Sequence, residues 1–239
     1  MLNRISVAPL YLQVKNKIIN DISAGIYTIG AQIPPEAELE KNYSVSRITI
    51  RRAITDLVDS GYLIKKQGKG TFVLNHKMKR NLLSLNSYTE YMLRNEEIPR
   101  RKIVRLGIIK ATSDLSKSLK IDQDAPVLRL ARVMTFEVKN KGYEVTYYPI
   151  KRFPDLESLI TEESSVSQIL RSEFHVKGKF NHKVLNLVTL DNGIASLMGL
   201  AIGTAAYKLE KITSDASKQP IYYSIMYYDP QKFSFVIDD

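Results

Sequence analysis

The segment from residue 46 to residue 61 constrains the fold more strongly than any other part of the sequence. Its apolar side chains recur with the 3.6-residue period of an amphipathic α-helix: Ile50, Ala53, Ile54, Leu57 and Val58. Ser46 is a typical N-cap residue, and Gly61 is typical of a helix C-terminus. The pattern therefore predicts a helix over 46–60 whose outward side carries Arg47, Ile48, Arg51, Arg52 and Thr55.

The flanking sequence predicts two more helices and a hairpin. Apolar residues spaced four apart indicate a helix over 10–24, which Gly25 ends. A Pro-Pro-Glu sequence at 34–36 is typical of a helix start and predicts a second helix reaching residue 44. Short strands at 62–66 and 71–74 enclose a glycine-rich turn. We therefore predict one compact domain over residues 1–74.

The remainder of the chain alternates strands with short helices. A polar, basic stretch predicts a linker at 75–82, followed by a second domain at 83–239. Content of β-branched and aromatic residues indicates strands at 103–111, 127–138, 143–150, 180–190, 205–213, 221–228 and 233–237. Helices are predicted at 87–95, 114–119, 166–174 and 194–200, and a turn at 140–142. Short connections favour an α+β class with an antiparallel sheet.

The charge is concentrated in the first third of the chain. Residues 1–80 carry 13 basic and 6 acidic side chains, whereas residues 81–239 carry 22 and 19. A small basic domain joined to a nearly balanced larger one is typical of a polyanion-binding module with an attached second function. A solvated basic surface is the alternative.

Composition excludes several classes of chemistry. The chain has no cysteine, which excludes disulfides, thiol catalysis and thiolate metal sites, and its three histidines lack metal-ligand spacing. We therefore expect no metal and no cofactor. No apolar run approaches the roughly 18 residues of a membrane span, and the N-terminus lacks a signal-peptide core. We expect a cytoplasmic protein without a membrane partner.

The helices over 36–60 have the arrangement of a helix-turn-helix, whose second helix enters the major groove of double-stranded DNA. Arg47 and Arg51 can reach guanine edges or phosphates, and Arg52 adds a third cation. Ser46 and Thr49 can donate to phosphate, and exposed Ile48 can touch a thymine methyl. A small helical bundle with a basic face remains the alternative.

The hairpin tip is a second candidate for contact with DNA. Gly68, Lys69 and Gly70 offer little side-chain bulk and one cation, which allows the backbone to approach a phosphate or a narrow minor groove. No helix follows this Gly-x-Gly, which disfavours a nucleotide-binding loop.

These motifs together resemble the winged-helix domain of the GntR family of bacterial transcription regulators. The matching pieces are Pro9-Leu10-Tyr11, Ile33-Pro34-Pro35-Glu36-x-x-Leu39, Val45-Ser46-Arg47-x-Thr49-Ile50-Arg51-x-Ala53, Leu57-x-x-x-Gly61 and Gln67-Gly68-Lys69-Gly70-Thr71-Phe72-Val73. The resemblance implies a winged helix-turn-helix that binds an operator as a homodimer.

Residues 81–237 resemble, more loosely, the effector-binding domain of the HutC-type branch, called UTRA. The matching pieces are Ser87-x-Thr89-Glu90, Ala125-Pro126-Val127 before Arg129-x-x-Arg132, Gly142-x-Glu144-x-Thr146-x-x-Pro149, Phe153-Pro154-x-Leu156, and Pro220-Ile221 before Tyr227-Tyr228. The resemblance implies a fold similar to that of chorismate lyase and a small-molecule effector, commonly a phosphorylated sugar.

The residues themselves favour an anion in this second domain. Strand alternation places Arg132 on the same face as apolar Leu128, Leu130, Met134 and Phe136, where a guanidinium needs an anionic partner. That partner is either a ligand or Glu144. Hydroxyls at two predicted helix starts can add hydrogen bonds, and tyrosines with Glu144 can take sugar hydroxyls. The candidate effector residues are Ser87, Tyr88, Thr89, Arg132, Glu144, Ser165, Ser167 and Tyr223.

The sequence thus predicts a homodimeric DNA-binding transcription regulator, a repressor whose operator binding is modulated by a small anionic effector. One alternative is an enzyme of the chorismate-lyase-like fold, although the second domain shows no paired acid and base and no activated nucleophile. The other alternative is a nonspecific DNA-binding protein.

Overall fold

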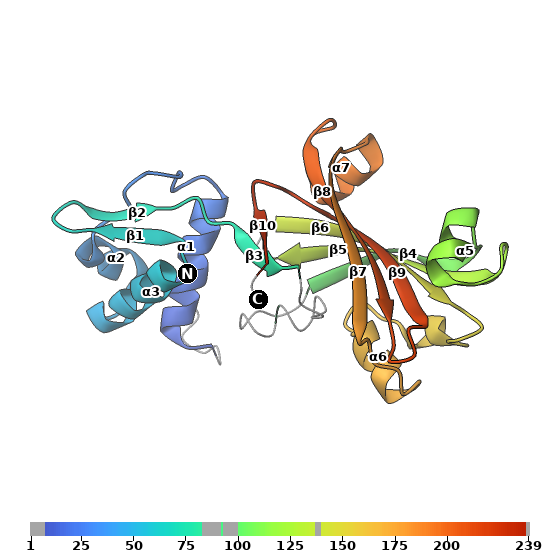
Figure 1. Ribbon diagram of the computed structural model, residues 1–239. Helices are drawn as coiled ribbons and strands as arrows, with labels where there is room; N and C mark the ends of the chain where they lie inside the picture. The colour runs from blue at the N-terminus through green and yellow to red at the C-terminus, as the bar shows by residue number, and fades with distance from the viewer. Residues whose placement is uncertain (1–7, 83–91, 93–99, 137–139, 238–239) are drawn as a thin grey trace. The chain divides into compact units, whose positions relative to one another are not determined.

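The computed structural model describes residues 8–82, 92, 100–136 and 140–237. The chain divides into two compact units, Met1–Lys77 and Met78–Asp239 (Figure 1). Each unit is described by itself below.

The first unit consists of three helices and a two-stranded hairpin, as predicted. Its elements are α1 (Leu10–Ser23), α2 (Glu36–Tyr43), α3 (Arg47–Asp59), β1 (Leu63–Lys66) and β2 (Gly70–Val73). The apolar stripes of the helices meet in a core that contains Val14, Ile18, Leu39, Ile50, Ile54 and Leu57, each almost fully buried. The apolar residues whose spacing predicted α3 are therefore the residues that pack in this core.

The hairpin gains a short third segment from the loop that follows α1. β1 and β2 are antiparallel, and Lys66 pairs with Gly70 at the tip. The loop bonds to β2 from the other side, because Ile33 N donates to Thr71 O and Val73 N donates to Ala31 O. This ladder ties the hairpin to the helices and holds its tip in a defined position relative to α3.

The second unit is built on a six-stranded antiparallel sheet in the order β4-β5-β6-β9-β8-β7. Its strands are β4 (Arg100–Lys110), β5 (Pro126–Phe136), β6 (Asn140–Pro149), β7 (Phe180–Thr189), β8 (Ala205–Ser214) and β9 (Pro220–Tyr228). The predicted antiparallel α+β class is confirmed.

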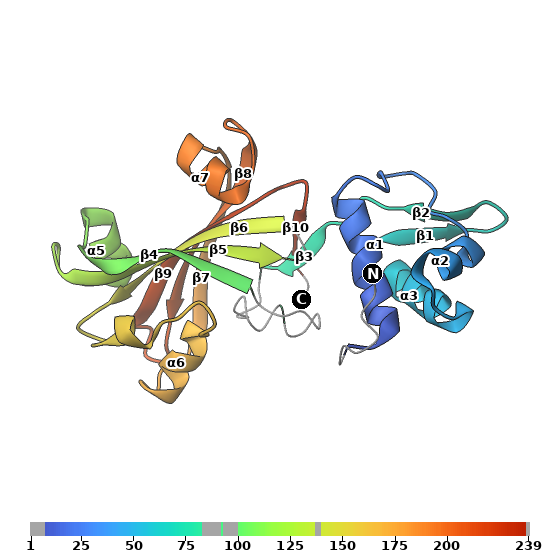
Figure 2. The same ribbon diagram turned by 180° about the vertical axis from the view of Figure 1, so that it is seen from behind.

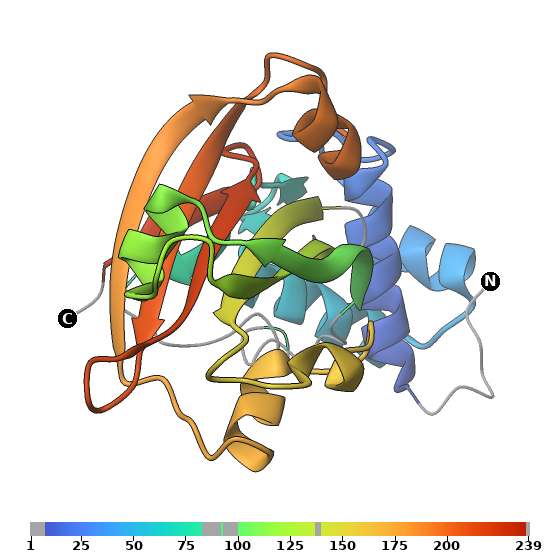
Figure 3. The same cartoon turned by 90° about the vertical axis from the view of Figure 1, so that its right-hand side faces the viewer.

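The two faces of this sheet carry different elements (Figures 2 and 3). We call the side with Leu128, Leu130 and Arg132 the Arg132 face. On it the 3-10 helix η1 (Leu156–Leu159) and α6 (Val166–Ser172) pack against Leu128 and Leu130. On the opposite face, α5 (Ser113–Leu119) and α7 (Asn192–Met198) pack against two separate apolar clusters.

A small second sheet covers one end of the Arg132 face. β3 (Met78–Asn81) pairs in parallel with β10 (Phe233–Val236). Phe233 contacts the rings of Phe136 and Tyr228 and closes a cluster rich in methionine and aromatic side chains. Residues 78–81 of the predicted linker therefore form a strand of the second unit. Sequence alone did not indicate this strand, because its pairing with residues 233–236 is distant in the chain.

The predicted turn at 140–142 is wrong, and the predicted helix at 87–95 stays untested. The predicted turn at 140–142 lies within β6, where Lys141 and Gly142 pair with Thr135 and Met134. The pairing of β5 with β6 thus extends further than the turn-like composition of these residues suggested. The predicted helix at 87–95 lies outside the described residues except for Met92, which is buried. No helix in the described part of the chain is long and apolar enough to cross a membrane.

Substitution of the two glycines at the hairpin tip tests the backbone conformation there. Gly70 has φ +113°, and a Cβ there would lie 2.2 Å from the Gln32 side-chain nitrogen, whereas Gly68 has φ +71° and open space. We expect Gly70→Ala to destabilise the first unit by roughly 1–3 kcal/mol, and Gly68→Ala by less, because φ +113° lies far outside the left-handed region open to alanine, whereas φ +71° lies at its edge. Urea denaturation of the two variants checks this order, and equal midpoints would contradict it.

Candidate functional site

The N-terminus of α3 is organised by a cap within the helix itself. Ser46 Oγ accepts a hydrogen bond from Thr49 N at 3.3 Å and lies 2.9 Å from Thr49 Oγ1. The two hydroxyl residues predicted to contact phosphate therefore also close the first turn of the helix. Both remain at the surface end of α3, beside exposed Arg47 and Ile48.

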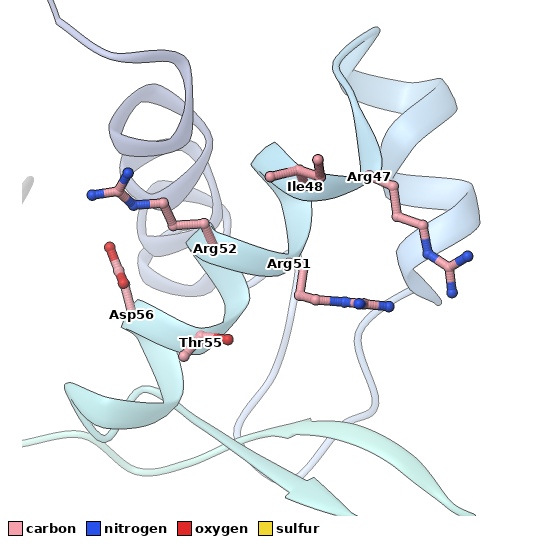
Figure 4. A pocket seen from close by; sticks show the side chains of 6 residues that line it. All are labelled: Arg47, Ile48, Arg51, Arg52, Thr55 and Asp56. Atoms are coloured by element: carbon pink, nitrogen blue, oxygen red, sulfur yellow. The ribbon is translucent and has the colours of Figure 1, made fainter.

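Arg47 and Arg51 extend from α3 toward α2 (Figure 4). Arg51 Nε lies 3.5 Å from Glu36 Oε2, and Arg47 Nε lies 4.0 Å from Glu40 Oε1. Lys65 on β1 also reaches Glu36, at 3.5 Å. These ion pairs are exposed and therefore weak, so they orient the arginines without burying their charge.

Arg52 differs from the other two arginines, because it extends toward α1 (Figure 4). Its guanidinium carbon lies 3.8 Å from the centroid of the Tyr11 ring, a cation–π contact. The outward face of α3 forms a shallow groove of about 360 Å³ lined by Arg47, Ile48, Arg51, Arg52, Thr55 and Asp56. Ile48 stands out of this face with 81% of its surface exposed, which is unusual for an isoleucine in a helix.

The hairpin tip is exposed at each predicted residue, Gly68, Lys69 and Gly70. Lys66, one residue before the turn, lies over the Phe72 ring at 4.7 Å. The first unit thus has a helix face rich in arginine and a basic hairpin tip, the two parts that a winged helix-turn-helix presents to DNA.

In the second unit, Arg132 and Glu144 form a buried ion pair in the middle of the sheet. They are register partners on β5 and β6, and Arg132 Nη2 donates to Glu144 Oε2 at 2.7 Å. Arg132 is only 7% exposed and Glu144 only 8%. Glu144, one of the two partners that the sequence left open for Arg132, is thus a partner in the structure.

The start of α6 lies next to this pair along the sheet. Ile103 on β4 is the register partner of Arg132, and its backbone N–H donates to Glu162 Oε1, in the loop that leads to α6. Ser165 is the N-cap residue of α6, but its side chain makes no capping hydrogen bond. Ser165 and Ser167 thus follow the loop that bonds to β4 at the register partner of Arg132. Ser87, Tyr88 and Thr89 lie outside the described residues.

Tyr223 was predicted in the same site as Arg132, and this prediction is wrong. Glu144 pairs with Met226 in register, so Tyr223, three positions away on β9, projects from the opposite face of the sheet. There its hydroxyl donates to Glu210 Oε1 at 2.5 Å. Burial and the negative charge of Glu210 raise the pKa of Tyr223. The described tyrosines on the Arg132 face are Tyr148, Tyr207, Tyr222 and Tyr228.

Three polar residues of the Arg132 face were not predicted. Thr146 and Ser224 are buried and pair with each other in register, and Lys211 pairs with Ser224 on the next strand. Their strands were predicted, but which strands are neighbours, and in which register, was not. The sequence signal was only that polar residues interrupt otherwise apolar strands.

Comparison with known proteins agrees with this architecture. The model of bacterial regulatory proteins of the gntR family matches residues 10–73, and the UTRA domain model matches residues 95–234. A crystal structure of PhnF from Mycobacterium smegmatis has a TM-score of 0.67 at 24% identity, over 95% of this chain and 98% of that one.

Two relatives match along almost their entire length. The uncharacterized HTH-type transcriptional regulator YurK of Bacillus subtilis is 37% identical over 100% of this chain and 98% of its own. A probable fructoselysine utilization operon transcriptional repressor of Escherichia coli O157:H7 is 31% identical over 99% of this chain and 97% of its own. These relatives are transcription regulators rather than enzymes. The chain therefore belongs to the GntR family of bacterial regulatory proteins, as a DNA-binding transcription regulator with a UTRA domain.

Proposed function

We propose that the chain is a homodimeric cytoplasmic repressor whose operator binding is modulated by a phosphorylated sugar bound on the Arg132 face. The observation that carries the effector proposal is the buried guanidinium of Arg132, which lies between two apolar clusters of the sheet face. The operator proposal rests on the exposed arginines of α3 and on the hairpin tip.

For the operator, we assign separate roles to the side chains of α3. Arg47 and Arg51 read guanine edges or contact phosphate, and Ile48 contacts a thymine methyl. Ser46, Thr49, Arg52 and the tip residues Gly68, Lys69 and Gly70 contact the DNA backbone, which positions the protein without reading sequence. The carboxylates of Glu36 and Glu40 lie beside Arg51 and Arg47 and restrain them only weakly before DNA arrives.

For the effector, the chemistry of Arg132 favours phosphate. A guanidinium has five N–H donors in a planar fork, so it can serve Glu144 and a phosphate together. The apolar clusters on both sides exclude water, which strengthens charge-assisted hydrogen bonds. Ser165 and Ser167, with Ser87, Tyr88 and Thr89, supply further polar contacts, and Glu144 takes a sugar hydroxyl.

The names of relatives support a sugar-derived effector. One is the fructoselysine repressor described above. Another is the mannosyl-D-glycerate transport/metabolism system repressor MngR of Escherichia coli, 30% identical over 65% of this chain and 65% of its own. Both names refer to the use of sugar conjugates, and we infer the same class of regulated genes here.

The first prediction from this proposal concerns the arginines of α3. Arg47→Ala and Arg51→Ala should each weaken binding to an operator selected from random duplexes by about 1–3 kcal/mol, because each removes a base or phosphate contact. Folding should persist, since both side chains lie off the buried stripe. Gel-shift titration measures the effect, with Lys177→Ala in the second unit as the control for lost charge. Unchanged affinity in both variants would overturn the assignment, and equal affinity for random duplex would favour nonspecific binding.

The second prediction concerns assembly. A single recognition helix reads few bases, so two protomers should bind a pseudo-palindrome with half-sites related by the dimer symmetry. Sedimentation should show a dimer, and footprinting should show a two-fold related protection pattern. A monomer that protects one half-site would contradict the proposal.

The third prediction concerns the buried ion pair. Arg132→Met alone should destabilise the second unit by about 3–5 kcal/mol because it leaves Glu144 buried without its partner, whereas Arg132→Met/Glu144→Leu should be close to wild type in stability. The double variant therefore tests binding without loss of the fold.

Thermal-shift screening of glucose 6-phosphate, other sugar phosphates and free glucose provides the measurement. Sugar phosphates should stabilise the wild type but not the double variant, and Arg132→Lys should respond weakly because lysine lacks the planar fork. Arg129→Met, on the opposite face of the same strand, is the matched control. If only uncharged sugars stabilise the wild type, Arg132 is a structural partner of Glu144 and does not bind the effector.

A further inference from the structure

Glu36 is a carboxylate at the surface that carries the arginines of α3. It is the first residue of α2, and its side chain is 25% exposed. One oxygen, Oε2, lies 3.5 Å from Arg51 Nε on α3, and the other, Oε1, lies 3.5 Å from Lys65 Nζ on β1. Glu36 thus stands between α3 and the hairpin. A negative charge at this place repels DNA phosphates, so its presence needs an explanation.

The helix dipole of α2 does not explain these contacts. An acidic residue in the first turn of a helix is favourable, and α2 has two, Glu36 and Glu38. Glu38 is exposed and makes no ion pair with a described residue. Both carboxylates interact with the dipole in the same way, but only Glu36 contacts cations of α3 and the hairpin. Glu36 therefore has a property that the start of the helix does not require.

Carboxylates stand beside only part of the positive charge of this surface. Arg51 and Lys65 share Glu36, so these three side chains together carry one net positive charge instead of two. Three other cations of α3 and the hairpin make no ion pair with a described residue: Arg52, Lys66 and Lys69. Unmatched cations are suited to phosphate contacts. The charge of Arg51, in contrast, is partly matched before DNA arrives.

The contact with Glu36 leaves the terminal edge of the Arg51 guanidinium open. It runs through Nε, and Nη1 and Nη2 make no hydrogen bond with a described residue. These two nitrogens form the fork that donates to O6 and N7 of guanine. The side chain is 59% exposed and lines the groove on the outward face of α3 (Figure 4). A base edge can therefore bind the fork while Glu36 keeps its contact with Nε.

The charge of the DNA group decides which group Arg51 accepts. A phosphate at the fork would lie within a Debye length of the Glu36 carboxylate, about 8 Å, where like charges repel. The guanine edge is an uncharged acceptor and meets no such repulsion. An exposed ion pair adds little to the stability of the free protein. In the complex, however, the DNA displaces water from this surface, and the repulsion is screened less.

We propose that Glu36 is a specificity-determining residue, which directs Arg51 to a guanine edge and lowers the affinity for DNA that lacks this guanine. The inference rests on the proposed function, which left open whether Arg51 contacts a base or a phosphate. Glu36 acts through Arg51, so it is a positioning residue. Specificity arises here from repulsion of the wrong DNA as well as from attraction to the right one.

Gel-shift titration of Glu36→Gln tests the proposal. The probes are the operator that the wild type selects from random duplexes and a random-sequence duplex of equal length. Glu36→Gln should bind the random duplex about tenfold tighter and the operator less than about threefold tighter, so the ratio of the two affinities falls. Glu38→Gln removes the same charge from the same helix turn and should keep the wild-type ratio. Equal ratios in the two variants would overturn the inference.

The salt dependence of binding gives a second readout. New phosphate contacts of Arg51 and Lys65 should steepen the plot of log K against log salt for the random duplex by about one to two in Glu36→Gln, and not in Glu38→Gln. Thermal denaturation of both variants measures the effect on the fold. If Glu36 only stabilised the start of α2, Glu36→Gln would lower the unfolding temperature without changing the ratio or the slope, which contradicts the proposal.

Arg51→Ala separates this inference from the proposed function. Operator variants changed one base pair at a time measure the preference at each position. Loss of the preference for one guanine in Arg51→Ala supports the inference. An equal loss of affinity for every sequence assigns Arg51 to phosphate, which overturns the inference and leaves the proposed function standing. Unchanged affinity for every duplex overturns the proposed role of Arg51 and the inference with it.

A double-variant comparison tests whether Glu36 acts through Arg51. At the guanine position found in this way, Glu36→Gln should reduce the preference for guanine in the wild-type background. In the Arg51→Ala background it should change that preference much less, because the side chain that it positions is absent. Equal effects in the two backgrounds would mean that Glu36 acts on the DNA by itself, and would overturn its positioning role.

Discussion

Side-chain alternation across the six-stranded sheet is the constraint on which the second unit depends. Because successive residues of a strand project to opposite faces, the register of five strand pairs decides which polar groups meet. One face receives a set of polar residues between two apolar clusters: Arg132, Glu144, Thr146, Ser224 and Lys211. The other receives the helices α5 and α7 together with four tyrosines, Tyr143, Tyr147, Tyr223 and Tyr227. A slip of one residue in any pair would separate these groups.

The polar groups of the Arg132 face are held in place by apolar packing on both sides. Toward one end, η1 and α6 cover Leu128 and Leu130, and toward the other, β3 and β10 cover Phe136 and Tyr228. Charges in such surroundings interact more strongly than in water, but they are also costly to leave unmatched. The Arg132–Glu144 pair meets this requirement within the protein.

The first unit depends on helix periodicity, which divides each helix into a buried side and an exposed side. Its buried stripes build a small helical core, and the side of α3 opposite that core is left for arginines and an exposed isoleucine. Acidic residues of α2 stand beside two of these arginines and restrain them through weak, exposed ion pairs. The surface is therefore partly ordered before DNA binds, which lowers the entropy lost on binding.

The sequence by itself determined the helices of the first unit and the outward face of α3, because period, caps and glycine stops are local signals that agree over residues 9–73. It also determined most strands, and it placed Arg132 correctly among apolar neighbours. Only the tertiary structure decided which strands adjoin. That decision moved Tyr223 to the opposite face, made residues 78–81 a strand, and brought Ser224 beside Lys211. These contacts join residues distant in the chain, and their register is set by the packing of the whole sheet, which no local pattern records.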